Sequence, residues 1–254
     1  MNRNMKINDD RKALAEQKAF VAVDVETTGL NPKSDDLLEI AAVMVSSGEV
    51  VASLSMLIQH EGAIPPEAAA VNGISPEMVL HAVPLKNALN TLLAFISDLP
   101  VVGHNVAFDV SFLEAALGRT LDNPLYCTSS IARRLFPPNK SSSLRSVCAF
   151  FGIANTQAHR ALGDASATAE AALALVNYGR NAAPMHRYIV IEQNTYNIRN
   201  TLKSLGFIWD NLNKKWHIAI PEPELATALT NHGEKGIRIY GIQCIKDGEE
   251  THNA

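Results

Sequence analysis

Apolar residues in the first quarter of the chain gather in short stretches that end at turn residues, a pattern typical of strands. Three such stretches predict an antiparallel meander at residues 19–26, 37–45 and 50–58. Glycine and proline lie between them, which suits tight connections. The polar segment 1–18 precedes the meander and is expected to form a leader or a frayed helix.

Further along, apolar side chains recur every three or four residues, which predicts helices. These helices are expected in PPEAAAVNGIS, PLKNALNTLLAFISDL, VAFDVSFLEAALG, SLRSVCAFFGI and ASATAEAALALVNYG. A short buried strand, PVVGHN, should come directly before the third of them. Strands followed by alternating helices and strands indicate an α/β layer fold over residues 19–180.

The pattern changes after residue 180, where a linker at 181–186 is expected to lead into a second domain. Residues 187–246 predict strand, helix, two strands, helix and strand, the order of many small α+β domains. Within this segment, FIWDNLNKKWHIAI predicts a hairpin and PELATALTNHG predicts the second helix. Residues 247–254 form a polar tail.

Composition narrows the class of protein. With 254 residues, 47% of them hydrophobic, the chain can bury a substantial core. Its three cysteines are odd in number and far apart, which argues against a disulfide framework or a cysteine zinc site. The leader holds no apolar run for a signal peptide or membrane helix, so we expect a cytoplasmic protein with no membrane partner.

The net charge of −4 is unevenly distributed along the chain. Residues 19–180 hold 15 acidic against 9 basic residues, whereas residues 187–246 hold 5 acidic against 8 basic ones. An acidic body repels phosphate unless bound cations reverse the local field. The basic surplus of the C-terminal segment is compatible with nucleic acid.

Two acids in the first strand need an explanation. Asp24 and Glu26 stand two positions apart, so they share the strand face that also carries Phe20 and Ala22. Two like charges beside apolar surface repel each other and lose hydration. We therefore expect another group to compensate their charge.

Two further acids and a histidine lie where the chain changes from one element to the next. Asp109 is expected on a helix that follows a buried strand, and Asp164 in the first turn of a later helix. His159 is expected on the loop before that helix, from which it can converge with Asp164. Taken alone, each residue has an ordinary interpretation, such as a solvated acid or an acid favoured by a helix dipole.

Together, the four acids and the imidazole predict a specific chemistry. Carboxylate oxygens are the ligands that Mg²⁺ and Mn²⁺ prefer. Two such ions stabilise the attacking and leaving oxygens when a phosphodiester bond is hydrolysed. A neutral histidine nearby can accept a proton from the attacking water.

Three motifs, DVETTGL, GHNVAFDVSFL and HRALGDA, resemble those of the DnaQ-like (DEDDh) 3′–5′ exonuclease family, in the family's order and within residues 20–175. The resemblance implies a ribonuclease H-like fold, a mixed sheet flanked by helices. It implies that two divalent metal ions, Mg²⁺ or Mn²⁺, are held by Asp24, Glu26, Asp109 and Asp164. His159 matches the general base of the family.

The same resemblance implies a pocket for the terminal nucleotide, lined by Thr27, Gly29, Leu30, His104, Asn105 and Phe108. Leu30 matches a wedge against the terminal base. For Leu30 and Phe108, ordinary packing is an equally good interpretation.

The C-terminal hairpin carries two aromatic residues and two lysines near its tip: Trp209, Lys214, Lys215 and Trp216. The tryptophans could stack on bases while the lysines meet phosphates. The alternative, which we favour, is that both tryptophans fill the core of a small domain.

The leading hypothesis is a 3′–5′ exonuclease that releases nucleoside monophosphates from DNA, in proofreading or repair. An exoribonuclease of the same family is one alternative, because the catalytic motifs do not reveal how the 2′-hydroxyl is sensed. Another is an accessory subunit whose C-terminal domain docks on a DNA polymerase. A catalytically silent nucleic-acid binder is disfavoured, because all five core residues are present.

Overall fold

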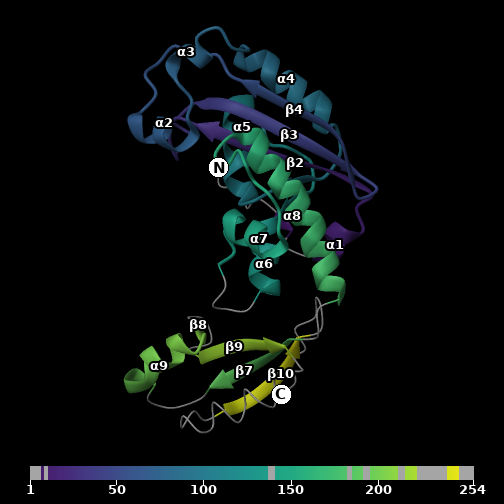
Figure 1. Ribbon diagram of the computed structural model, residues 1–254, viewed down its shortest axis with the longest axis vertical. Coiled ribbons are helices and arrows are strands. Elements are labelled where there is room, and N and C mark those ends of the chain that lie inside the picture. Colours follow the sequence, from purple (N-terminus) through teal and green to yellow (C-terminus); the bar gives the residue numbers. More distant parts are fainter. Residues whose placement is uncertain are drawn as a thin grey trace. The chain divides into compact units, whose positions relative to one another are not determined.

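The predicted meander is the antiparallel half of a six-stranded mixed sheet (Figure 1). The computed structural model describes residues 7–8, 11–136, 141–181, 185–190, 195–210, 215–221 and 239–245. The chain divides into two compact units, which are described separately. The first comprises Met1–Arg134 with Ser142–Asn177, and the second comprises Leu135–Ser141 with Tyr178–Ala254.

The large sheet is antiparallel on one side of β2 and parallel on the other. Its antiparallel strands are β2 (Ala19–Thr27), β3 (Leu37–Ser46) and β4 (Glu49–Leu57). The parallel strands are β1 (Ile7–Asn8), β5 (Val101–Gly103) and β6 (Leu125–Cys127). The order β1-β6-β5-β2-β3-β4 places β2 inside the sheet, between β5 and β3.

Helices make up most of the other described residues up to position 181. They are α1 (Arg11–Ala15), α2 (Pro66–Asn72), α3 (Pro76–Val79), α4 (Leu85–Ile96), α5 (Val106–Leu117), α6 (Thr128–Leu135), α7 (Leu144–Phe151) and α8 (Ala161–Asn181). None of the described helices combines the length and the apolar character needed to cross a bilayer. All five predicted helices are present, and the α/β class is confirmed.

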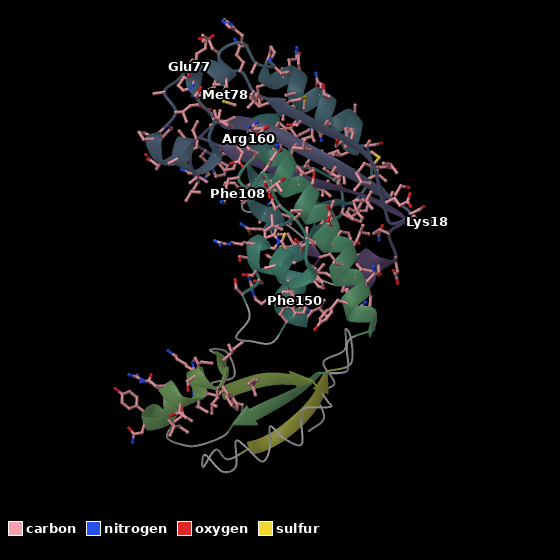
Figure 2. The ribbon with its side chains drawn as sticks, viewed as in Figure 1. Lys18, Glu77, Met78, Phe108, Phe150 and Arg160 are labelled. Atoms are coloured by element: carbon pink, nitrogen blue, oxygen red, sulfur yellow. The ribbon has the colours of Figure 1, made fainter. Side chains whose placement is uncertain are left out.

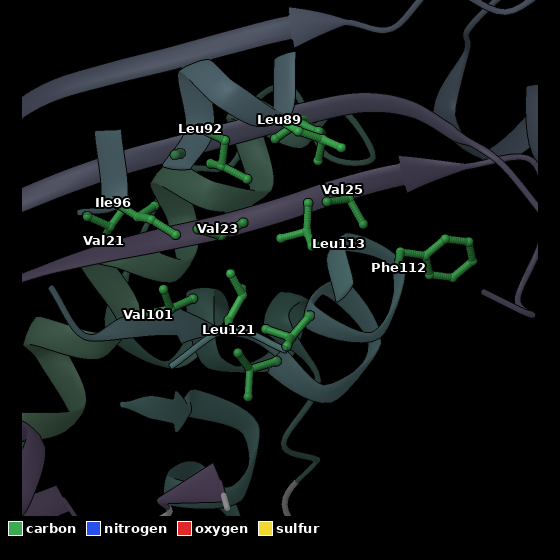
Figure 3. Close-up of a cluster of buried hydrophobic side chains, with 14 of the residues drawn as sticks. Val21, Val23, Val25, Leu89, Leu92, Ile96, Val101, Phe112, Leu113 and Leu121 are labelled. Carbon is green, nitrogen blue, oxygen red and sulfur yellow. The ribbon is translucent and has the colours of Figure 1, made fainter. Parts of the chain in front are cut away.

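Side chains on one face of β2 belong to the main hydrophobic core (Figure 3). Val21, Val23 and Val25 lie in the same buried cluster as Leu89 and Leu92 of α4. Because strand side chains alternate, Asp24 and Glu26 lie on the opposite face. The odd-numbered valines therefore anchor the strand, and the even-numbered acids remain available for a site.

Some elements were not apparent in the sequence pattern. The three-residue strand β6 and the helix α6 that follows it were not predicted. Within the predicted leader, Ile7–Asn8 pairs in parallel with Leu125 and Tyr126 of β6, and Leu14 of α1 is buried. This part of the segment 1–18 contributes to the first unit.

The second unit contains a four-stranded antiparallel sheet in the order β10-β7-β9-β8. Its elements are β7 (Met185–Val190), η1 (Tyr196–Ile198), α9 (Arg199–Ser204), β8 (Ile208–Asp210), β9 (Lys215–Pro221) and β10 (Ile239–Ile245). The expected hairpin is the β8–β9 pair. The predicted helix in PELATALTNHG lies outside the described residues.

Candidate active site

Three of the predicted acids converge on the face of β2 opposite the valines. Asp24, Glu26 and Asp164 each offer a carboxylate oxygen, and these oxygens lie within 4.8 Å of one another. All three residues are partly buried. Residues that are 138 positions apart, Glu26 and Asp164, thus share one site because α8 begins beside the end of β2.

Asp164 is held by two donors from the chain segment just before α8. Its Oδ1 accepts a hydrogen bond from Asn155 Nδ2 at 2.5 Å, and its Oδ2 accepts one from the backbone N–H of His159 at 3.1 Å. Both bonds are local, and they fix the carboxylate in the first helical turn. The loop that carries His159 is therefore tied to the acidic cluster.

Asp109 approaches the cluster from the buried side. It lies in the first turn of α5, is only 4% exposed, and accepts a hydrogen bond from the backbone N–H of Val25 at 3.1 Å. Val25 is the residue between Asp24 and Glu26. Asp109 is thus fixed to the acidic stretch of β2, although it is not one of the three acids whose oxygens converge.

Burial and mutual repulsion raise the pKa values of the carboxylates in the site. Burial, and then the charges of Asp109 and Asp164, raise the pKa of Asp24 well above its usual value. Burial and the charge of Asp164 raise the pKa of Glu26 to about 8, and burial raises that of Asp109 to about 8. Carboxylates this crowded require cations or protons, and oxygen-only donors suit Mg²⁺ or Mn²⁺.

His159 lies beside this cluster on an exposed loop. It immediately precedes Arg160 and α8, and its backbone has φ of 64°, in the left-handed region. A non-glycine residue adopts this conformation only when its surroundings support it. The bond from its N–H to Asp164 is one such support.

The turn after β2 carries the first part of the predicted nucleotide pocket. Thr27 is buried and its hydroxyl donates to the carbonyl of Gly29 at 2.5 Å. A Cβ on Gly29 would lie 2.4 Å from Oδ2 of Asp35, which itself accepts from the N–H of Asn31. Glycine therefore permits the turn. Leu30 is 84% exposed, so it has little packing of its own to satisfy.

The second part of the predicted pocket consists of His104, Asn105 and Phe108, and two of these side chains contact other residues of the protein. Both ring nitrogens of His104 are engaged, Nδ1 with the hydroxyl of Thr128 and Nε2 with the carbonyl of Ser142, each at 2.9 Å. Burial lowers the pKa of His104, which favours the neutral ring. Phe108 packs on Phe112 with ring centroids 5.0 Å apart. Phe108 is only partly buried, so it could still meet a substrate, while Asn105 is exposed with φ of 77°.

The hairpin of the second unit places its two tryptophans on one face. Trp209 and Trp216 are directly paired across β8 and β9, and their ring centroids lie 5.5 Å apart. Trp216 is buried and its Nε1 donates to the hydroxyl of Thr195 at 3.2 Å, whereas Trp209 is 38% exposed. The core interpretation thus suits Trp216, and Lys215 is partly buried. Lys214 lies outside the described residues.

Four residues around the acids were not singled out from the sequence. Glu39 is 2% exposed on β3 and binds Arg160, which is labelled in Figure 2. Asn155 holds Asp164, and Gly163 lets the backbone of Gln157 pass close to α8. An acid inside the apolar stretch LLEIAAVMV was the available signal for Glu39. A glycine among helix formers was the signal for Gly163.

A mixed sheet with carboxylates gathered on an inner strand is an arrangement of the ribonuclease H-like nucleases. A family model described as Exonuclease (RNase_T) matches residues 21–172. The chain belongs to this DnaQ-like exonuclease family.

Relatives with known names support this placement. The chain is 34% identical over 155 residues to the DNA polymerase III subunit epsilon of Aquifex aeolicus, with 59% of this chain and 77% of the relative covered. It is 32% identical over 208 residues to the PolC-type DNA polymerase III of Clostridium perfringens, with 72% of this chain covered. The match spans only 14% of that longer polymerase.

The fold is shared with solved structures. E. coli exonuclease I in complex with a dT13 oligonucleotide superimposes with a TM-score of 0.57 at 18% identity, covering 67% of this chain and 48% of that one. At this identity the likeness concerns the fold. The ribonuclease H-like fold expected from the motifs is confirmed.

Proposed function

We propose that this chain is a divalent-cation-dependent 3′–5′ exonuclease that shortens DNA by one nucleoside monophosphate at a time, in proofreading or repair. The observation that carries the proposal is the convergence of Asp24, Glu26 and Asp164 beside Asp109, in a chain of an exonuclease family. Membership of the family accounts for nuclease activity. Direction and substrate are the parts to be tested.

The four carboxylates are the residues that would hold the cations. Two Mg²⁺ or Mn²⁺ ions bound there would neutralise the crowded acids, offset the charge of the scissile phosphate and make a bound water more acidic. The charges of Asp109, Asp164 and Glu26 all raise the pKa of Asp24, so a bound cation would relieve repulsion at this residue. Asp24 would therefore be one of the residues that hold the cations.

His159 is proposed as the general base. It lies on an exposed loop beside the acids, and its backbone N–H donates to Asp164. A water oxygen forms a bond to the terminal phosphorus while the bond from phosphorus to the 3′-oxygen of the preceding nucleotide breaks. The imidazole accepts the proton of that water, and the departing 3′-oxygen takes a proton from solvent water to become a hydroxyl.

The substrate end is proposed to lie over the turn after β2. The exposed side chain of Leu30 can wedge against the terminal base, while the turn built by Thr27 and Gly29 brings backbone close to the sugar. Asn105, exposed at the start of α5, is the polar group proposed to meet the nucleotide from the other side. His104 would act by holding the Ser142 segment in place.

DNA is favoured over RNA as the substrate because the relatives described above are DNA polymerase III proteins. The same names favour a DNA polymerase as a partner, for which the second unit would be available. An exoribonuclease with the same acids remains the alternative that the experiment below must separate.

The test compares 5′-labelled single-stranded DNA, a duplex and an RNA of the same sequence, each with Mg²⁺ or with EDTA. We expect a ladder that shortens one nucleotide at a time from the 3′ end of DNA, in Mg²⁺ only. Asp24→Asn should lose at least about 100-fold in rate, since cation stabilisation of the transition state amounts to several kcal/mol. Asp122→Asn, at an exposed acid, is the matched control. Immediate release of the 5′ label, or equal degradation by Asp24→Asn, would contradict the proposal.

A further inference from the structure

Glu39 is an acid beside the proposed site whose oxygens are all used by the protein. It lies directly opposite Glu26 in the β2–β3 register and is 2% exposed. Its Oε1 accepts from the hydroxyl of Ser55 at 3.1 Å and from Nη2 of Arg160 at 3.0 Å. Its Oε2 accepts from Nε of Arg160 at 2.9 Å and from the backbone N–H of Ala161 at 3.2 Å.

These four bonds give Glu39 a role different from that of its neighbours. Burial by itself would raise the pKa of Glu39, but the hydrogen bonds from Arg160 and Ala161 hold it below the usual value. Glu39 is therefore charged while Glu26, across the same pair of strands, has a raised pKa. Because its oxygens already have donors, Glu39 is not available as a cation ligand.

Two of the donors to Glu39, Arg160 and Ala161, are adjacent residues at the point where the loop with His159 enters α8. Arg160 directly follows His159, and Ala161 is the first residue of α8. The backbone N–H of His159 donates to Asp164, in the first turn of α8. The segment from His159 to Ala161 is thus fixed at two points, by Glu39 of β3 and by Asp164 of α8. Within it, the backbone of His159 lies in the left-handed region.

The geometry points to the Glu39–Arg160 pair as a positioning device for His159. This inference rests on the proposed function, in which His159 is the base. The bidentate contact fixes both the place and the plane of the guanidinium. It thereby fixes the residue before it, so that the imidazole is presented to the acids. Without the pair, the loop would keep the bond from the His159 N–H to Asp164 and the bond from the Arg160 N–H to the carbonyl of Gln157. The Arg160 side chain would no longer be anchored to β3, and the imidazole before it would sample other orientations.

The side chain of Arg160 is partly exposed to solvent, so a direct contact with substrate is the competing interpretation of its role. Its side chain is 38% exposed and borders a cavity of about 390 Å³ that Met56, Met78 and Val83 help to line. Met78 and Arg160 are both labelled in Figure 2. Through this side Arg160 could contact a substrate phosphate directly. A contact of that kind would change substrate affinity, whereas positioning acts on the chemical step.

The experiment is a double-mutant cycle in the full-length chain, with the variants Arg160→Lys, His159→Ala and the two combined. Lysine keeps the charge but cannot make the bidentate contact. Single-turnover rates of 3′ nucleotide release and KM are measured on single-stranded DNA with Mg²⁺. Arg119→Lys, at an exposed arginine, is the matched control, and Glu39→Gln probes the pair from its other partner. Thermal unfolding and Mn²⁺ affinity are measured on every variant.

We expect Arg160→Lys to lower the single-turnover rate on the order of 10- to 100-fold, the scale of a small misplacement of a reacting group. KM and Mn²⁺ affinity should change less than about threefold. In the His159→Ala background the same substitution should cost less than about threefold, because the group that it positions is gone. Glu39→Gln should behave like Arg160→Lys, and Arg119→Lys like the unaltered protein.

Other outcomes overturn the inference. A rate unchanged by Arg160→Lys and by Glu39→Gln would show that the pair positions nothing that matters. An equal loss in the His159→Ala background would show that the pair acts on the cations or on the fold. A rise in KM alone would assign Arg160 to the substrate phosphate. Full activity of His159→Ala would instead remove the base from the proposed function, which is a separate failure.

Discussion

At the scale of single residues, the site is built from acids whose charges the protein alone does not balance. Asp24, Glu26 and Asp109 all have raised pKa values, while Glu39, on the adjacent strand, forms an ion pair with Arg160. The difference lies in the donors available to each carboxylate. Among the described residues, the acids of the site that form no ion pair with a basic side chain are the ones proposed to hold cations.

This imbalance predicts how stability depends on pH. Glu26 and Asp109 have pKa values of about 8 in the folded protein, against ordinary values of 4.5 and 3.8. Between these limits the folded chain keeps protons that the unfolded chain has released. The free energy of unfolding should therefore fall as pH rises from about 4 to about 8, since stability decreases wherever the folded state binds more protons.

Thermal unfolding in EDTA and in Mg²⁺, at about pH 6, 7 and 8, checks this prediction. In EDTA the midpoint should drop across the series. In Mg²⁺ the drop should be smaller, because the cations replace the protons. Glu26→Gln should show a shallower slope in EDTA. A midpoint that rises with pH in EDTA, or equal slopes in both solutions, would count against the described electrostatics.

The site residues that could be predicted form a local sequence pattern, whereas the residues that were missed depend on contacts between distant positions. Asp24 and Glu26 were found because a same-face pair of acids in an apolar strand is uncommon. Glu39 leaves a single acid in an apolar stretch, and its partner Arg160 is 121 residues away. Periodicity carries no information about contacts over that separation, so only the fold brings the two together.

At the scale of elements, the start of α8 depends on a close approach of the backbone. A Cβ at Gly163 would lie 2.3 Å from the carbonyl oxygen of Gln157. The glycine lets the loop that carries His159 pass over the first helical turn, next to Asp164. A residue with a side chain at this position would push that loop away.

Gly163→Ala should therefore destabilise the protein, although alanine usually stabilises a helix by about 1 kcal/mol relative to glycine. Overpacking typically costs about 1–3 kcal/mol. The exonuclease rate should fall as well, because the loop carries the proposed base. Glu170→Ala, at an exposed position of α8, is the control and should change neither quantity. Increased stability of Gly163→Ala with full activity would show that the loop adapts freely.

The β8–β9 hairpin separates its two tryptophans by burial. We propose that the exposed face of Trp209 stacks on single-stranded DNA, while Trp216 supports the small sheet. Trp209→Ala should then weaken binding of single-stranded DNA by about 1–3 kcal/mol, measured by fluorescence anisotropy. Trp216→Ala should instead lower stability by about 3–5 kcal/mol. Unchanged DNA binding by a folded Trp209→Ala variant would leave Trp209 with a packing role alone.

At the scale of the whole molecule, much of the architecture could be predicted from pattern. The meander, the five predicted helices and the α/β class followed from periodicity and turn residues, because each of these elements spans at least about two repeats of its pattern. Strands β5 and β6 have three residues each, and β1 has two. Such short strands are defined by their neighbours in the sheet, so β1 and β6 left no local pattern.

The charge of the molecule predicts that DNA binding depends on divalent cations. Residues 19–180, which carry the site, hold 15 acidic against 9 basic residues. His159→Ala, which should turn over slowly, allows binding of single-stranded DNA to be measured in Ca²⁺ and in EDTA. Affinity should be at least about tenfold higher in Ca²⁺, because the cations reverse the local field. Equal affinity in both would mean that the acids do not face the DNA.

The central claim is that the gathered carboxylates hold two cations at which a 3′ end is cut. Anomalous diffraction from crystals grown with Mn²⁺ and a deoxynucleoside 5′-monophosphate tests it most directly. We predict two anomalous peaks bounded by Asp24, Glu26, Asp109 and Asp164, with the phosphate of the nucleotide against them and His159 facing that phosphate. Clear density for the nucleotide elsewhere, with no anomalous signal among these acids, would contradict the account.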